Sequence, residues 1–371
     1  MKCDVAIIGC GVVGAAIAYE LSRQSLSVVT LDAGAPAGQA TGAALGVMMA
    51  INTLQQHGPV VDLRLASLAR FETVVADLES QLDYSLPVNR QGLLRLIAPD
   101  AWEKWLPAIA ARQVANYDLH PLDAEGIARL QPAVQWQGRG LHSLGDRQIE
   151  PRAFVQALVR AAQQKGAQFF FNEPVLRLKS ERGRVNALYT RHRTLSAGTT
   201  IVAAGLGSSQ FNQQLGLDLP IAPVKGQALR IRPAAPLLYG PPITDGDVNI
   251  VPLADGTYWI GATVEFDASI QSPTLGGIQT LMQQAIQLLP VLQDAELIDA
   301  WAGIRPRPSG QRAPILGRSP LHQNVIIATG HYRNGVLLAP ITAQVVKDLL
   351  IEGKTHACDL SAFSPRAASL E

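Results

Sequence analysis

The stretch that decides the fold is Asp4-Val-Ala-Ile-Ile-Gly-Cys-Gly-Val-Val-Gly14, close to the N-terminus. Residues 4–9 form a short, apolar, β-branched run that ends at a glycine, as a buried parallel strand does. Residues 12–23 follow with helical spacing, and residues 27–32 (Ser-Val-Val-Thr-Leu-Asp) indicate the next strand. The pattern predicts a strand–helix–strand unit with a right-handed crossover.

The glycines of this stretch have the spacing Gly9-x-Gly11-x-x-Gly14. The first glycine permits a tight turn, the second lets the backbone approach a pyrophosphate, and the third lets helix and strand pack closely. The helix N-terminus then offers N–H groups to the phosphates. Asp32, at the end of the second strand, can accept hydrogen bonds from a ribose and would repel a 2′-phosphate, which disfavours NADP. The motif predicts a bound dinucleotide but does not separate NAD from FAD.

Composition excludes several classes of protein. The 371 residues carry a formal net charge of +1 with no long run of like charge, so we expect no nucleic-acid partner. The three cysteines, Cys3, Cys10 and Cys358, lack Cys-x-x-Cys spacing and favour a reducing, cytoplasmic compartment. The apolar run from Val5 to Ala18 contains the motif glycines, and we expect no membrane span, which needs ~20 apolar residues. No histidine cluster has metal-ligand spacing, so we expect no metal site.

A second small-residue segment follows the motif. Residues 35–50 are rich in Gly and Ala and nearly free of charge, which predicts a loop entering a tightly packed helix. Within them, Thr41 to Met48 would let the backbone lie close against the ribityl chain and ring of FAD. Close packing of helix on sheet explains the same small residues equally well, and both interpretations stay open.

The remaining pattern alternates between helices and strands, with strands prevailing from 221 to 263. We expect helices at 59–83, 151–166, 274–289 and 336–351, and strands at 92–97, 168–171, 200–204, 228–231, 249–252, 258–263 and 324–328. The order predicts an α/β fold with an α+β insert. A Rossmann-like domain would comprise residues 1–86, 148–220 and 301–371, and an antiparallel-sheet substrate domain residues 87–147 and 221–300.

Two arginines lie in Gly/Pro-rich segments that we expect to be loops. Arg305 lies in Trp301-Ala-Gly-Ile-Arg-Pro306, and Arg333 lies in Gly330-His-Tyr-Arg-Asn-Gly335, just before a predicted helix. Arginine holds a carboxylate with a planar fork, so this pair predicts a small carboxylate-bearing molecule beside the dinucleotide. His331 is interpreted as shaping the loop before Arg333 rather than as a base. The helix from Gly335 would place positive dipole character at the pyrimidine edge of a flavin.

These segments resemble the D-amino-acid-oxidase class of flavoproteins, and within it the glycine-oxidase family of the thiamin pathway. The resemblance covers the whole chain and is weakest between 85 and 145. It is carried by Asn249-Ile-Val-Pro, Gly261-Ala-Thr, Trp301-Ala-Gly-Ile-Arg305-Pro and, most specifically, Gly330-His-Tyr-Arg333-Asn-Gly-Val-Leu-Leu-Ala-Pro340.

The resemblance implies an FAD-binding Rossmann-like domain, non-covalent FAD, and oxidation of glycine, sarcosine and small D-amino acids by O2. It also implies a homotetramer and a thiazole synthase partner. By resemblance, Arg305 clamps the substrate carboxylate, Arg333, Asn249 and Val264 line the substrate site, and Val175 contacts the adenosine. The full set of expected cofactor residues is Gly9, Gly11, Val12, Val13, Gly14, Asp32, Ala33, Thr41, Gly42, Ala43, Ala44, Gly46, Val47, Met48, Val175, Ala204, Gly205, Gly303, Arg305, Gly330, His331, Arg333, Asn334, Gly335, Val336 and Leu337.

The chain departs from the family at two positions. The family often has Tyr where this chain has Asn249, and Val264 stands where a bulkier apolar residue lines the pocket, so we expect a roomier site. No cysteine corresponds to the flavin-linking residue of the sarcosine-oxidase branch, because Cys358 lies too far toward the tail.

The predicted chemistry is hydride transfer from the substrate Cα to the flavin, which needs positioning and electrostatics but no catalytic base. The products would be an imino acid, then the oxo acid, ammonia and H2O2. Two alternatives remain: a flavin dehydrogenase that passes electrons to a quinone or another acceptor, and a flavin-binding module without turnover.

Overall fold

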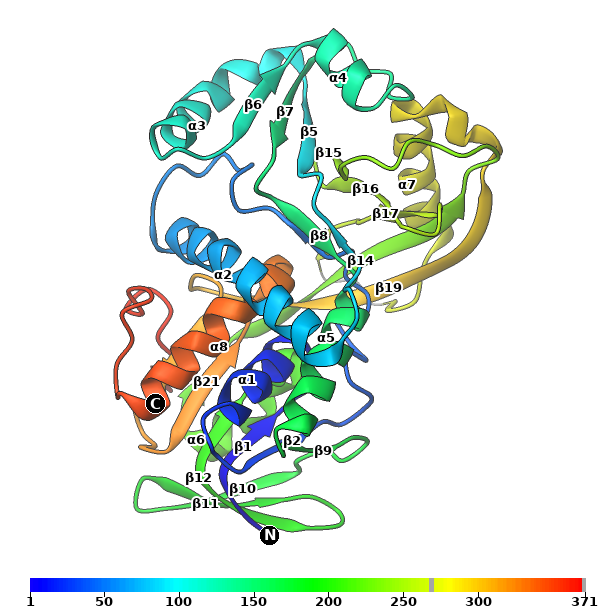
Figure 1. Ribbon diagram of the computed structural model, residues 1–371. Helices are drawn as coiled ribbons and strands as arrows, with labels where there is room; N and C mark the ends of the chain where they lie inside the picture. The colour runs from blue at the N-terminus through cyan, green and yellow to red at the C-terminus, as the bar shows by residue number, and fades with distance from the viewer. Residues whose placement is uncertain (267–269, 369–371) are drawn as a thin grey trace.

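The computed structural model describes residues 1–266 and 270–368, and two large sheets dominate it (Figure 1). The predicted strand–helix–strand unit is present as β1 (Lys2–Ile8), α1 (Val12–Ser22) and β2 (Val28–Leu31). It lies in the lower lobe of Figure 1, whereas β5 (Leu93–Ile97) and the strands beside it lie in the upper lobe. The mixed α/β class expected from the sequence is confirmed.

The first sheet has a parallel centre with antiparallel flanks. Its strands run in parallel from β9 through β2, β1 and β12 to β21, while β11 and β20 add antiparallel edges. Parallel strands covered on both faces are apolar throughout, which is why Val5 to Ile8 are all buried. The bounds not yet given are β9 (Gln168–Phe170), β10 (Arg177–Glu181), β11 (Arg184–Tyr189), β12 (Thr194–Val202), β20 (Ile315–Arg318) and β21 (Val325–Thr329).

Long helices pack together beside this sheet. α1 contacts both α5 (Pro151–Gln164) and α8 (Gly335–Ile351), and α2 (Pro59–Leu82) contacts α5 and α8 in turn. Every residue of α1 is buried, so its apolar run reflects a central core position. Phe154 of α5 meets Phe71 of α2 edge to face, with ring centroids 5.8 Å apart.

The second sheet is almost entirely antiparallel. Its order is β18-β14-β17-β16-β15-β5-β7-β6, and β19 pairs with β14 from Ile221 opposite Pro308 to Arg232 opposite Glu296. Among the described residues, the one parallel pair of this sheet is β15 with β5. Bounds are β6 (Leu119–Leu122), β7 (Arg139–Ser143), β14 (Ile221–Arg232), β15 (Ile243–Asp245), β16 (Val248–Pro252), β17 (Tyr258–Gly261), β18 (Glu265–Phe266) and β19 (Glu296–Pro308).

Smaller elements complete the fold. The minor sheets are β3 (Val47–Met48), β8 (Arg147–Ile149) and β4 (Val88–Asn89), and β13 (Leu217–Asp218) with β22 (Arg366–Ala367). The other helices are α3 (Trp102–Val114), α4 (Ala124–Leu130), α6 (Asn212–Leu215) and α7 (Leu275–Leu288), with short 3-10 turns at Pro99–Ala101, Gly205–Phe211, Pro290–Asp294 and Tyr332–Asn334.

Several expected elements differ from the structure. The segment from Trp301 to Pro306 is strand β19 and not a loop, because its pairing with β14 overrides the local Gly and Pro signals. Within the described chain β19 pairs only with β14, and such an edge strand tolerates proline. It also crosses the domain boundary predicted after residue 300. The strand expected at 200–204 begins earlier, at Thr194, and ends at Val202.

Two further expectations concern helices. The loop at 35–50 enters the short strand β3 rather than a helix, and the next helix after α1 begins only at Pro59. Helices α3 and α4 were not expected at all. One helical stretch, Tyr332–Ile351, is long and apolar enough to span a membrane, although none was expected; 67% of its most apolar window is buried in the molecule.

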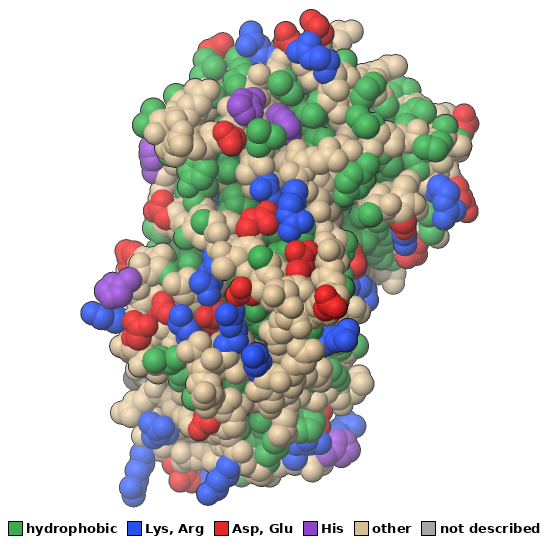
Figure 2. All heavy atoms as spheres, viewed as in Figure 1, with side chains coloured by type: hydrophobic (Ala, Val, Ile, Leu, Met, Phe, Trp, Pro, Cys, Tyr) green, Lys and Arg blue, Asp and Glu red, His purple; other side chains and the backbone are tan. Residues whose placement is uncertain are grey.

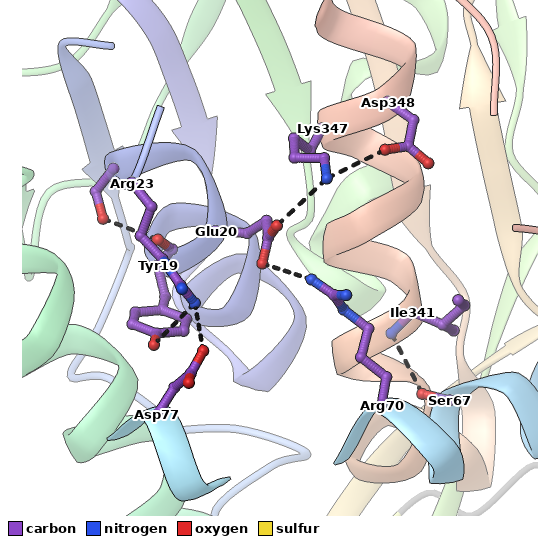
Figure 3. A network of polar contacts seen from close by, with 10 residues as sticks. Tyr19, Glu20, Arg23, Ser67, Arg70, Asp77, Ile341, Lys347 and Asp348 are labelled. Carbon is purple, nitrogen blue, oxygen red and sulfur yellow. Dashed lines mark hydrogen bonds and ion pairs between the residues drawn. The ribbon is translucent and has the colours of Figure 1, made fainter. Parts of the chain in front are cut away.

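A charged cluster ties three of the packed helices together (Figure 3). Glu20 of α1 is only 6% exposed and pairs with Arg70 of α2 at 2.9 Å and with Lys347 of α8 at 3.7 Å. Ser67 of α2 adds a buried hydrogen bond, since its hydroxyl accepts from the Ile341 N–H of α8 at 3.3 Å. Glu20 therefore pairs with both cations at the junction of α1, α2 and α8, and Asp348 of α8 also pairs with Lys347 at 3.4 Å.

We predict that Glu20→Gln lowers the free energy of unfolding by about 1–3 kcal/mol, because it leaves the partly buried Arg70 without an acid, while Lys347 keeps Asp348 at 3.4 Å. Urea unfolding measures this change. Glu125→Gln is the control, since it breaks the exposed pair of Glu125 with Arg129 on α4 and should cost less than about 0.5 kcal/mol. Equal effects of the two substitutions would contradict a stabilising role for the cluster.

Candidate functional site

A cavity of about 1080 Å³ is lined by residues from both large sheets. One end holds the carboxyl ends of β1 and β2 and the start of α1, where parallel sheets bind nucleotides. The other end holds residues of β5, β15, β16 and β19 from the second sheet. Figure 2 shows basic and acidic side chains interspersed over the face it displays, as the near-zero net charge implies.

The glycine turn lies at the nucleotide end. Gly9 has a φ of +105°, and a Cβ on it would lie 2.5 Å from the Ala203 carbonyl oxygen. A Cβ on Gly14 would lie 1.9 Å from the Gly9 carbonyl oxygen, so α1 can approach the turn this closely only with glycine there. The N-cap of α1 is Gly11. The backbone N–H groups at the N-terminus of this helix can donate to a phosphate.

Asp32 lines the same end of the cavity. Its carboxylate accepts from the N–H groups of Cys10 at 2.5 Å and of Gly34 at 2.8 Å. Through these hydrogen bonds Asp32 holds the glycine turn in place, and it also lies where a ribose would bind.

The small-residue segment packs against both the helix and the second sheet. The Thr41 hydroxyl accepts from the Val12 N–H at 3.1 Å, and the Trp301 indole donates to the Ala43 carbonyl at 3.0 Å. A Cβ on Gly303 would lie 2.3 Å from that of Ala43. The small residues therefore serve close packing and line the cavity at once.

Most of the expected cofactor residues line this cavity. Those that do are Gly9, Gly11, Val12, Val13, Asp32, Ala33, Thr41, Ala43, Ala44, Gly46, Val47, Val175, Ala204, Gly205, Gly303, Arg305, Gly330, His331, Arg333, Asn334, Gly335 and Val336. Gly14, Gly42, Met48 and Leu337 do not line it: Gly14 and Gly42 face backbone atoms, while Met48 and Leu337 belong to the core. Among the expected substrate residues, Asn249 lines the cavity and Val264 does not.

Arg305 is a half-buried cation held by backbone carbonyls. Its Nη1 donates to the carbonyl oxygens of Lys225 at 3.1 Å and Thr263 at 3.0 Å. Gly226 makes room for it, because a Cβ there would lie 2.1 Å from Nη2. Burial, and then the charge of Arg333, lower the pKa of this guanidinium. Within residues 1–266 and 270–368 no acid forms an ion pair with it, so a substrate carboxylate would complete its pairing.

Arg333 and Asn249 have partners of their own. Arg333 pairs with Asp247, and both side chains are exposed, so the pair adds little stability. Asn249 accepts from the Thr244 hydroxyl at 2.7 Å and donates to the Gly261 carbonyl at 3.3 Å. Its amide is therefore held in the sheet and does not extend freely into the cavity.

His331 is neutral and buried. Burial lowers its pKa to about 3, and its Nε2 is hydrogen-bonded with the Thr342 hydroxyl of α8 at 3.0 Å. This contact fixes the loop at 330–335 to the helix that follows, in keeping with a shaping role for the residue.

Sequence reasoning missed several cavity residues. Arg64, Arg95, Thr244, Asp247 and Tyr332 all line it. Arg64 was expected only as part of a long helix and Arg95 as part of a strand, and no spacing links either to the glycine motif. Only the pairing of the second sheet brings Arg95 beside Thr244. Among the described residues, no group of three or more His, Cys, Asp or Glu could hold a metal ion.

The cavity suits an extended dinucleotide with a flavin ring. The glycine turn, the start of α1 and Asp32 fit the nucleotide. The cavity walls at Ala43, Gly46 and Gly303 leave room beside the nucleotide. The glycine positions among these features depend on the backbone and would be blocked by larger side chains.

Comparisons with known proteins identify the family of the chain. A family model described as "DAO: FAD dependent oxidoreductase" matches residues 4–349. The chain is 29% identical to a glycine oxidase of Geobacillus kaustophilus over 97% of this chain and 96% of that one. The crystal structure of glycine oxidase from that organism has a TM-score of 0.91 and covers 98% of each chain.

Two other relatives are similar along nearly the whole chain. The bifunctional protein ThiO/ThiG of Synechocystis sp. is 34% identical over 98% of this chain, which spans 54% of that protein. The structure of iminodiacetate oxidase (IdaA) from Chelativorans sp. BNC1 is 27% identical with a TM-score of 0.89, covering 99% of this chain and 100% of that one. Because the family match spans most of the sequence, the chain belongs to the DAO family of FAD-dependent oxidoreductases.

Proposed function

We propose that this enzyme catalyses oxidative deamination of glycine and other small amines, such as sarcosine and small D-amino acids. The observation that carries the proposal is Arg305, a half-buried guanidinium without an acidic partner in the described chain, in the cavity that the dinucleotide motif also lines. The glycine oxidase relatives support this choice of substrate. Glycine, O2 and water would give glyoxylate, ammonia and H2O2.

The cofactor would be held without a covalent bond. The cavity-lining residues at the ends of β1 and β2 and at the start of α1 would hold the nucleotide, and those from Thr41 to Val47 would lie along the flavin. None of Cys3, Cys10 and Cys358 lines the cavity, so we propose no thiol linkage. When bound, FAD supplies the two-electron acceptor for the substrate's C–H bond.

The protein residues would bind and orient the substrate. Arg305 would hold the carboxylate in one orientation through its planar fork, which places the amine carbon. His331 is neutral and buried, so it would keep the cavity wall free of charge near the reacting amine. Arg333 would contribute positive potential at the same end of the cavity. No side chain is assigned as a base, and catalysis would rest on positioning and electrostatics.

The wider role would be in thiamin thiazole formation, with a thiazole synthase as partner, in a cytoplasmic homotetramer. The bifunctional ThiO/ThiG relative supports the link, since a protein of that name contains a region similar to this chain.

The proposed function is tested by oxygen uptake and peroxide release with glycine and sarcosine. We expect both substrates to consume O2 with equal amounts of H2O2. The same assay with an artificial dye distinguishes an oxidase from a dehydrogenase. Reduction of the dye without uptake of O2 would show a dehydrogenase, and absence of flavin from the purified protein would end the proposal.

Arg305→Ala should raise the KM for glycine at least about tenfold while FAD stays bound, because a charge-assisted hydrogen bond to the carboxylate is lost. Steady-state kinetics and the flavin spectrum measure the two effects. Arg307→Ala is the matched control, since Arg307 is exposed on the same strand and stacks on Phe266. An unchanged KM in Arg305→Ala would remove Arg305 from this role.

Asp32→Ala should weaken FAD binding about tenfold or more, because the carboxylate braces the glycine turn and would bind the ribose. Titration of the apoprotein, followed by quenching of flavin fluorescence, measures the dissociation constant. Asp4→Asn, at the exposed opposite end of β1, should leave the constant unchanged. A normal constant for Asp32→Ala would contradict the assigned position of the nucleotide.

A further inference from the structure

The substrate end of the cavity holds more positive charge than one carboxylate requires. Arg64 of α2 and Arg95 of β5 line it together with Arg305 and Arg333. Of the described residues, the acids on its wall are Asp32 at the nucleotide end and Asp247. Asp247 already pairs with Arg333.

Arg64 is a cation with almost no partners. In the described part of the chain it forms no ion pair, its Nε is buried without a hydrogen-bond partner, and its Nη1 reaches only Gln55 Oε1 at 3.5 Å. Burial, followed by the charge of Arg333, lowers the pKa of its guanidinium. A half-buried cation next to another cation is costly unless an anion joins them.

Arg95 lies in line with the substrate residues of the second sheet. It is opposite Thr244 on β15, and Thr244 is opposite Asn249 on β16, so the three side chains share one face. Its guanidinium lies 5.1 Å from the ring centroid of Trp105, and its Nε donates to Asn52 Oδ1 at 3.1 Å.

Neighbouring acids offset the positive charge of Arg95 only in part. Burial lowers its pKa to about 10; Arg333 acts in the same direction, while Asp146, Asp245 and Asp247 oppose the shift. None of these acids forms an ion pair with Arg95 within the described residues. Its surroundings therefore contain carboxylates at a distance and none in contact.

A purely structural arginine in the same region looks different. Arg112 of α3 donates from Nε, Nη1 and Nη2 to the carbonyl oxygens of Ile51, Gln56 and Gln55, at 3.2, 3.1 and 2.8 Å, and does not line the cavity. Arg64 has no such set of carbonyl partners. The pyrophosphate of FAD does not explain Arg95 either, because Arg95 lies on β5 of the second sheet and the glycine turn that would bind the pyrophosphate belongs to the first.

We propose that Arg64 and Arg95, beside Arg333, form a second anion site that binds a second carboxylate of the substrate. The inference rests on the proposed function and refines it. The substrate class becomes amino acids that carry a carboxylate on the amine or on the Cα side chain. Arg305 holds the carboxylate next to the reacting carbon, and the second site holds the carboxylate of the arm.

The test compares acids with their uncharged amides of the same shape. Three pairs serve: iminodiacetate with its monoamide, D-aspartate with D-asparagine, and D-glutamate with D-glutamine. For the holoenzyme we expect kcat/KM to be at least tenfold higher for the acid in at least one pair. A ratio near or below one in all three pairs would overturn the inference.

Variants then assign the preference to residues. Arg64→Gln and Arg95→Gln should each lower the acid-to-amide ratio of the preferred pair about tenfold, with FAD content checked by the flavin spectrum. Arg129→Gln removes an equal charge from exposed α4 and should leave the ratio unchanged. A ratio that persists in both cavity variants would overturn the assignment. If Arg95→Gln does not fold, the acid-to-amide ratios of Arg64→Gln and of the wild type still decide whether the second anion site exists.

Anaerobic reduction of the flavin separates failure of this inference from failure of the proposed function. If no amino acid or N-substituted glycine bleaches the flavin, the proposed function itself is wrong. If glycine or sarcosine bleaches it and the acids hold no advantage over their amides, only the second anion site is wrong.

Discussion

The contact between the start of α1 and the end of β1 is the constraint on which the site depends. At Gly14 the helix approaches the backbone of Gly9 so closely that one added carbon would collide with a carbonyl oxygen. This contact aims the N-terminus of α1 into the cavity and leaves Asp32 beside it. A helix displaced by the width of a methyl group would no longer present its N–H groups at the same place.

The second sheet is brought to this turn by similarly close contacts. Gly303 of β19 lies against Ala43, and Trp301 donates to the carbonyl of Ala43. The strand that makes these contacts also carries Arg305. The distance between the dinucleotide end of the cavity and the half-buried Arg305 guanidinium is therefore set by packing of small residues, which leaves little freedom for side-chain movement.

Charged side chains have different partners in the core and at the cavity. In the core, Glu20 lies between Arg70 and Lys347, and the cations that join α1, α2 and α8 have an acid in contact. At the cavity, burial and the charge of Arg333 lower the pKa values of Arg64, Arg95 and Arg305, and none of the three has an acid in contact among the described residues. The same residue type thus stabilises the fold in one place and remains available to an anionic ligand in the other.

The sequence by itself determined the first strand–helix–strand unit, the glycine turn, Asp32 and most helix bounds, because these depend on neighbours a few residues apart and on local periodicity. It also singled out Arg305 and Arg333 through their unusual surroundings. Only the tertiary structure decided that Trp301 to Pro306 is a strand, since that outcome depends on pairing with residues about 80 positions earlier. The tertiary structure likewise brought Arg64 and Arg95 to the cavity. They come from a helix and a strand whose local sequence patterns indicate buried faces and no binding site. Both outcomes depend on long-range pairing and packing, which no short window of sequence contains.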